Sequence, residues 1–239
     1  MEIEQSAFVL HSRPYRETSA LVTFFTPDYG KINGVVRGVR GGRKTASQKT
    51  AMLQPFQQLT LQWREKPNNR SDLLSIQQIE MGSLRFPLQA EGNICGLYVN
   101  ELLYRLLFPQ VATEALFDLY QQTLYQLLSA EKRNDQAWSL RQFEHLFLAE
   151  MGHGIQCDED INQQPIQPEQ AYFFYPQYGA VLASLDSQKQ GLAIQGECLL
   201  AMQEMRYCEE CLPSLKKLYR WVLAHYLGDK PIMTRELFN

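Results

Sequence analysis

The sequence of 239 residues lacks the features of exported and membrane-spanning chains. Its first residues, Met1-Glu2-Ile3-Glu4-Gln5, are acidic and contain neither the basic start nor the apolar stretch of a secretory signal. No apolar run approaches the roughly 20 residues that a membrane span needs. We therefore expect a cytoplasmic protein that does not contact membranes.

Cysteine is scarce and irregularly spaced, and an odd count argues against a disulfide framework and favours reduced thiols. Cys208 and Cys211 form a single C-x-x-C pair, whereas a structural zinc site needs four ligands. His153 and Cys157 would complete such a site only if the fold brought them close. We expect no bound metal and no other cofactor. The five cysteines are Cys95, Cys157, Cys198, Cys208 and Cys211.

Common catalytic motifs are missing as well. The chain contains no H-E-x-x-H, G-x-S-x-G or G-x-G-x-x-G segment. Residues 38–45 read G-V-R-G-G-R-K-T, which resembles a phosphate-binding loop, but Arg43 separates Gly42 from Lys44 and breaks the required G-K-[ST] order. We therefore expect a protein that is not an enzyme.

The formal net charge of −3 hides an uneven distribution. Residues 1–80 hold 11 basic and 7 acidic side chains, whereas residues 81–239 hold 12 and 19. Residues 29–64 contain seven basic side chains and no acidic one. Such a segment in a mildly acidic protein indicates contact with a polyanion, and the alternative is a solvated basic loop.

Residues 1–80 show the short period and turn residues of β-structure. Pro27-Asp28-Tyr29-Gly30 supplies turn chemistry, because proline presets φ and glycine accepts the left-handed conformation. Five strands in about 80 residues predict a small closed barrel of the OB-fold type, with an SH3-like barrel as the main competitor. The expected strands are Ala7–His11, Ser19–Thr26, Lys31–Val39, Leu53–Trp63 and Leu73–Ile79.

Beyond residue 80 the apolar period changes to that of helices. Residues 154–188 interrupt it with three prolines and the run Tyr172-Phe173-Phe174-Tyr175, which is typical of a hairpin or small irregular insert. We predict an α+β protein: an OB-fold barrel over 1–80, then an α-helical domain over 81–239 that contains the insert. Helical spacing marks Tyr98–Leu106, Leu116–Leu128, Trp138–Phe147, a segment near Cys198, and Leu212–Tyr226 with Gly228 as its cap.

Several segments, in the right order, resemble the RecO family of recombination mediators. The first two run from Ala7 to Ser19 and from Phe25 to Lys31. Arg37-Gly38-Val39-Arg40 stands where the family shows K/R-G-A-R. The other matching segments are Leu53–Phe56, Gly96–Leu103, Leu140–Glu144 and Gly228–Phe238.

This resemblance implies an N-terminal OB-fold, a helical C-terminal domain, and binding and annealing of DNA, with association with the nucleoid when DNA is bound. It also implies work with RecR to load RecA onto single strands coated by single-stranded-DNA-binding protein (SSB), and docking on the acidic C-terminal tail of SSB. Many family members carry four cysteines in the insert. Residues 154–188 hold only Cys157, so the family's zinc site is expected to be lost.

Proteins that bind single strands pair a cationic groove with aromatic platforms on which bases stack. Tyr15 and Tyr29, beside turns, are the stacking candidates, whereas whichever of Phe24 and Phe25 points inward is expected to pack the core. The function classes left open are an OB-fold RNA-binding module and a protein adaptor. The expected DNA contacts, to single and double strands, are Arg13, Arg16, Lys31, Arg37, Arg40, Arg43, Lys44 and Lys49.

A receptor for the SSB tail needs a cation beside an apolar slot. Arg141 is the candidate, because arginine holds a carboxylate with two parallel hydrogen bonds, and Leu102 is a candidate wall of the slot. The alternative for Arg141 is an intramolecular salt bridge to Glu144 or Glu101.

Overall fold

The computed structural model describes residues 1–41, 44–64, 73–186, 188, 190–228 and 230–238. Contacts group the chain into two compact units, Met1–Ser129 with Ile232–Asn239, and Ala130–Pro231, and each is described by itself. A domain boundary near residue 80 stays a prediction. Among the described residues, no helix has the length and apolar character needed to span a membrane.

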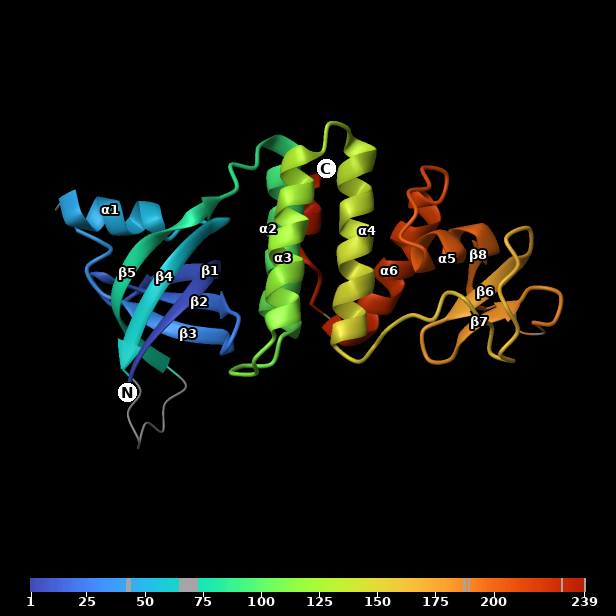
Figure 1. The fold of residues 1–239 in the computed structure, drawn as a ribbon, viewed down its shortest axis with the longest axis horizontal. Coiled ribbons are helices and arrows are strands. Elements are labelled where there is room, and N and C mark those ends of the chain that lie inside the picture. The colour runs from blue at the N-terminus through green and yellow to red at the C-terminus, as the bar shows by residue number, and fades with distance from the viewer. Residues whose placement is uncertain (42–43, 65–72, 187, 189, 229, 239) are drawn as a thin grey trace. The chain divides into compact units, whose positions relative to one another are not determined.

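Five strands of the first unit form a closed barrel in the order β1-β2-β3-β5-β4 (Figure 1). Every neighbouring pair is antiparallel except β3 and β5, which run parallel. A helix, α1 (Lys44–Met52), joins β3 to β4. This order is that of an OB-fold, which confirms the predicted α+β class. The strands are β1 (Glu2–Tyr15), β2 (Ser19–Thr26), β3 (Gly30–Val36), β4 (Gln57–Arg64) and β5 (Leu73–Arg85).

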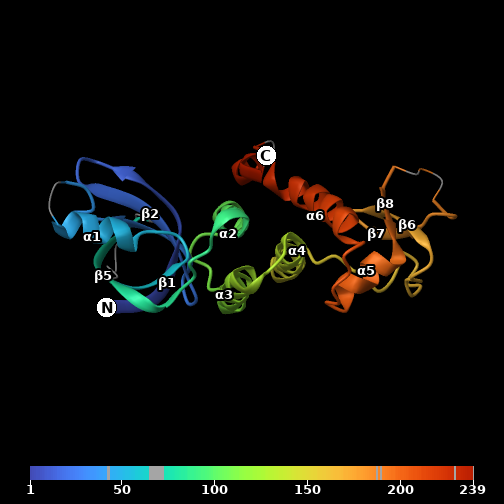
Figure 2. The same cartoon turned by 90° about the horizontal axis from the view of Figure 1, so that it is seen from above.

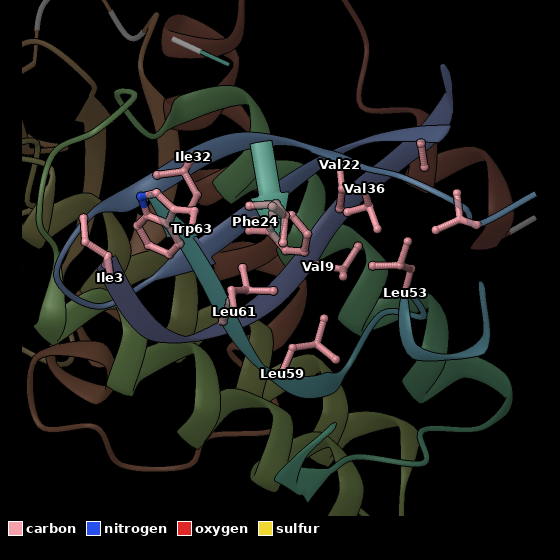
Figure 3. Packing of buried hydrophobic residues seen from close by; sticks show 14 residues of the cluster. Ile3, Val9, Val22, Phe24, Ile32, Val36, Leu53, Leu59, Leu61 and Trp63 are labelled. Carbon is pink, nitrogen blue, oxygen red and sulfur yellow. The ribbon is translucent and has the colours of Figure 1, made fainter. Parts of the chain in front are cut away.

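The barrel core is built by alternate residues, because successive side chains of a strand point to opposite faces. Figure 3 shows Trp63 beside Ile3 and Ile32 at one end of the core, and Val36 near Leu53 at the other. Leu53 lies just after α1, so the helical connection also contributes to the core.

The boundaries of β1, β3, β4 and β5 differ from those expected, and β1 and β5 continue to Tyr15 and Arg85, beyond the expected ends at His11 and Ile79. β1 begins at Glu2 because its first half pairs with β4 and its second half with β2, a double use that no local pattern reveals. β3 ends at Val36, before Gly38 adopts a positive φ of 68°. Phe56 lies outside β4 and has a φ of 64°, so the strand begins at Gln57.

Two helices pack against the outside of the barrel, α2 (Ala90–Leu106) and α3 (Glu114–Ser129). Phe8 of β1 contacts Phe117 and Tyr120 of α3, with ring centroids 5.5 and 5.1 Å apart. The ring centroid of Phe25 of β2 lies 5.4 Å from that of Phe117. These rings make an apolar contact between barrel and helices.

A buried polar group fixes the orientation of this contact. Asn100 of α2 donates its Nδ2 to the carbonyl oxygen of Val9 at 3.2 Å. The hydroxyl of Tyr120 donates to Oδ1 of Asn100 at 2.7 Å. Because a buried amide without partners is costly, these bonds select one alignment of helix and strand.

The β2–β3 turn is held by the loop between α2 and α3. The amide of Gln110 donates to the oxygen of Lys31 at 3.0 Å, and that of Thr113 donates to Pro27 at 3.1 Å. Gly30 has a φ of +57°, and a Cβ there would lie 1.9 Å from the carbonyl oxygen of Val111. Glycine is therefore required at this position both by conformation and by space.

The C-terminal segment returns to the first unit. There it forms η1, a 3-10 helix over Met233–Phe238, whose first residues bond to Glu101 of α2. The Glu101 carboxylate accepts the amides of Met233 and Thr234 at 2.8 and 2.9 Å, and also the hydroxyl of Thr234. Two of the segments that resemble the RecO family thus contact each other.

The second unit combines helices with a three-stranded sheet of order β7-β6-β8. β6 and β7 form the hairpin predicted for the insert. The third strand, β8, lies beyond residue 188, where the insert was expected to end. Gly228 caps α6 with a φ of 66°, as predicted. The elements are α4 (Arg133–Glu150), β6 (Ala171–Tyr175), β7 (Gly179–Leu182), β8 (Leu192–Gln195), α5 (Gly196–Gln203) and α6 (Leu212–Leu227).

The expectation of reduced cysteines is wrong for one pair. Cys198 of α5 and Cys211, which precedes α6, form a disulfide. The turn between the helices brings their Cα atoms to 5.2 Å, a separation that a disulfide spans. Cys208 is a free thiol whose Sγ lies 2.7 Å from that of Cys211. Spacing alone gave no sign that the C-x-x-C pair would meet Cys198.

Gly30→Ala should lower the free energy of unfolding by more than the about 1–2 kcal/mol that a left-handed alanine costs, because the new methyl meets Val111. Gly38→Ala is the matched control, since Gly38 also has a positive φ but nothing lies within 4 Å of its added Cβ. Urea unfolding of both variants measures the difference. Equal losses would show that the close approach to Val111 has no energetic weight.

Candidate nucleic-acid interface

Two basic segments that lie apart in the sequence meet at one end of the barrel. The first is the β1–β2 turn, and the second follows β3 at residues 37–41. The amides of Val39 and Arg40 donate to the carbonyl oxygen of Thr18 at 2.9 and 3.2 Å. We call the residues 13–18 and 37–41 the basic end of the barrel.

Aromatic and cationic groups are combined at this end. Arg16 has a left-handed φ of 53°, and its guanidinium lies 5.2 Å from the ring centroid of Tyr15. Glu17 adds one exposed negative charge at the same turn. A turn that presents a ring with a cation over it is suited to contact with a base and its phosphate.

Four of the expected DNA contacts, Arg13, Arg16, Arg37 and Arg40, are exposed at the basic end. Lys49 of α1 joins them, because its Nζ donates to the carbonyl oxygen of Arg37 at 3.2 Å. Arg13 and Arg40 line one hollow of about 500 Å³ together with Pro14. The structure thus brings five of the eight predicted cations together.

Figure 2, turned from the view of Figure 1, shows α1 beside the barrel. Arg43 lies outside the described residues. Lys44 is the first residue of α1, and only its backbone is described. Their predicted DNA contacts stay predictions.

Lys31 and Tyr29 have structural contacts that the sequence did not reveal. Lys31 donates its Nζ to the carbonyl oxygen of Tyr104 at 2.7 Å, and burial lowers its pKa below the ordinary value. Tyr29 packs edge-on against Trp63 at 5.3 Å and adjoins the barrel core. Their DNA contacts stay predictions, but both side chains already hold parts of the fold together.

His11 and Tyr104 were not expected at a site, yet both line a second hollow beside Arg13. The ring centroids of His11 and Tyr104 are 5.0 Å apart. Tyr104 lies on a helix, where its spacing marked no function, so only the packing of α2 on the barrel reveals its position.

The two residues predicted to hold the SSB tail are buried. Arg141 of α4 makes a two-bond pair with Glu144, with Nε–Oε2 at 2.6 Å and Nη2–Oε1 at 2.7 Å. The arginine side chain is 6% exposed and the glutamate 0%. This is the intramolecular alternative that the sequence left open. Leu102 is buried in α2 of the first unit. Whether either residue contacts a partner stays a prediction.

No group of three or more His, Cys, Asp and Glu side chains is arranged to hold a metal ion within the part of the chain that the structure describes. Cys157 is fully buried, and burial raises the pKa of its thiol to about 12.

Topology and site together define an α+β protein built on an N-terminal OB-fold, with cations and an aromatic ring gathered at one end of the barrel. Comparison with known proteins identifies the family. Residues 1–84 match the model of the recombination protein O N-terminal domain, and residues 88–236 match that of its C-terminal domain.

Relatives agree over almost the whole chain. The DNA repair protein RecO of Nitrosococcus oceani is 39% identical over 237 residues, covering 98% of this chain and 92% of the relative. That of Nitrosospira multiformis is 38% identical, with 98% and 94% covered, and that of Pseudomonas aeruginosa is 37% identical, with the same coverage. The chain belongs to the recombination protein O family, whose role lies in DNA repair and recombination.

Arg141→Ala should lower the free energy of unfolding by about 3–5 kcal/mol, because it removes the positive charge that is paired with the buried carboxylate of Glu144. The double variant Arg141→Met/Glu144→Leu should recover most of this loss, since it removes both charges and keeps apolar volume. Urea unfolding followed by tryptophan fluorescence measures both. If the double variant is as unstable as the single one, packing rather than charge explains the loss.

Proposed function

We propose that this protein binds single-stranded DNA at the basic end of the barrel and anneals complementary strands in recombinational repair. The supporting observation is the meeting of two basic segments through the bonds from Val39 and Arg40 to Thr18. Cations that follow one another along a groove track the phosphates of a strand, and binding releases the counterions of those phosphates.

The position of the basic end suits an OB-fold. In this fold the face of the second and third strands and the loop between the first and second bind oligonucleotides. Arg16 and Tyr15 lie at that loop, and Arg37 follows the third strand. Phosphate contacts from arginine are independent of base sequence, as annealing of arbitrary complementary strands requires.

The proposed partners follow from the family. With RecR, the protein would help load RecA onto strands coated by SSB, and it would dock on the acidic SSB tail. Arg141 is the candidate for the tail carboxylate, although two of its N–H groups already donate to Glu144. The proposed role is that of a mediator without a catalytic step, associated with the nucleoid when DNA is bound.

The deciding experiment is annealing of complementary labelled strands coated with SSB, with and without the purified protein. Acceleration is expected. An adaptor without a direct DNA contact would leave the rate unchanged, and an RNA-binding module would bind structured RNA more tightly than single-stranded DNA in a competition assay.

The variant Arg13→Ala/Arg16→Ala/Arg37→Ala/Arg40→Ala should weaken DNA binding and flatten its dependence on salt. The slope of log affinity against log salt should fall by up to about 0.7 for each phosphate of a single strand that is no longer neutralised. The fold should persist, because exposed charges seldom change stability by more than about 0.5 kcal/mol.

The matched comparison uses two charges at a time. Arg16→Ala/Arg40→Ala removes two cations from the basic end, whereas Arg64→Ala/Lys217→Ala removes two exposed cations elsewhere. Only the first pair should change the slope, as measured by fluorescence anisotropy of a labelled oligonucleotide at several salt concentrations. Equal slopes for both double variants and the wild type would remove the basic end from the DNA site.

A further inference from the structure

A polar hollow lies on the outer face of the barrel, next to the basic end. Its volume of about 330 Å³ falls within the range of small-ligand sites. Strand register explains its floor, because His11 of β1 lies opposite Thr23 of β2, and Thr23 lies opposite Asn33 of β3. Arg13 forms part of the rim, and Tyr104 of α2 forms a wall.

The floor offers both hydrogen-bond donors and acceptors. The hydroxyl of Thr23, which is 6% exposed, donates to Oδ1 of Asn33 at 2.7 Å. With its oxygen engaged, Asn33 keeps the two N–H donors of its amide, and the Thr23 oxygen keeps acceptor capacity. Among the described residues, no hydrogen bond from Nδ2 of Asn33 is found. Such a pair matches the mixed edge of a nucleobase.

The wall is the aromatic ring of Tyr104, which contacts His11 of the floor. Tyr104 is 40% exposed, and His11 stands 5.0 Å from it at an interplanar angle of 35°. Lys31 donates its Nζ to the main-chain oxygen of Tyr104 and also lies 5.9 Å from the ring centroid, so a cation accompanies the aromatic ring at this wall. Sequence-tolerant binding of bases relies on rings of this kind.

The hollow is continuous with the basic end. His11 and Arg13 line both this hollow and the neighbouring one that Arg40 lines. A strand whose phosphates lie along Arg40 and Arg13 would bring its next base to Tyr104 and Asn33.

We propose that this hollow holds one unstacked nucleobase, with Tyr104 stacking on its face and Asn33 and Thr23 bonding to its edge. The inference rests on the proposed binding of single strands and assigns its base subsite. It makes α2 part of the DNA site. It predicts a preference for single strands, since a base paired inside a duplex cannot enter the hollow.

The test uses the full chain and two probes of equal length, oligothymidylate and an abasic oligonucleotide with the same phosphates. Wild type should prefer oligothymidylate. Tyr104→Ala should weaken its binding by about tenfold, within the range for loss of one stacked base, and should leave the abasic probe and the salt slope unchanged. Tyr104→Phe should behave as wild type.

Tyr125→Ala is the control, because Tyr125 is a half-exposed tyrosine on α3 of the same unit, away from the hollow. The Lys31 bond survives in Tyr104→Ala since it uses the main chain. If Tyr104→Ala binds both probes as wild type does, with a normal salt slope, the base subsite is wrong and DNA binding stands. If wild type binds neither probe, the proposed function fails together with the subsite.

Discussion

The contact between the barrel and α3 is the interaction on which the rest of the first unit depends. Phe8 and Phe25 project from the outside of β1 and β2, and both are fully buried because Phe117 and Tyr120 cover them. Burial of large rings is favourable but does not select one orientation of the helices on the barrel. The hydrogen bonds of Asn100 with Val9 and Tyr120 select that orientation. Once this contact is aligned, the loop after α2 meets Gly30, and Tyr104 reaches the barrel face.

Much of this fold could be predicted because its signals are local. β2 matches its expected bounds, since a run of β-branched and aromatic residues ends in Pro27 and Gly30. The helices of both units follow from apolar spacing. Local signals fail where one element covers another: alternation assigns one of Phe24 and Phe25 to the core and leaves the other outside. Both are buried, Phe24 in the barrel core and Phe25 under α3. The helix α1 was missed because its residues, K-T-A-S-Q-K-T-A-M, have weak amphipathic character.

The candidate site, too, could be predicted from the sequence only in part. A basic run in the sequence drew attention to the arginines near β3, but it could not show that Arg40 would lie against Thr18. It also treated every cation alike. Lys31 is half-buried and bonded to α2, whereas Arg37 and Arg40 are exposed, and only three-dimensional contacts separate the two kinds. Likewise, the sequence shows only that Arg141 and Glu144 are three positions apart on one helix, whereas the structure shows that the two side chains are buried and paired.

The return of the chain end to Glu101 has a consequence for how the second unit is attached. Because η1 belongs to the first unit, residues 130–231 are inserted within it and are connected at both ends. In a terminal module, changes of length alter the end of the chain. In an inserted module, changes of length occur between two anchored points, and the entropic cost of holding those two points together grows only slowly with the length of chain between them. The inserted unit is therefore the part of this architecture in which whole hairpins can be added or removed while the barrel, its two helices and the C-terminal anchor stay packed together.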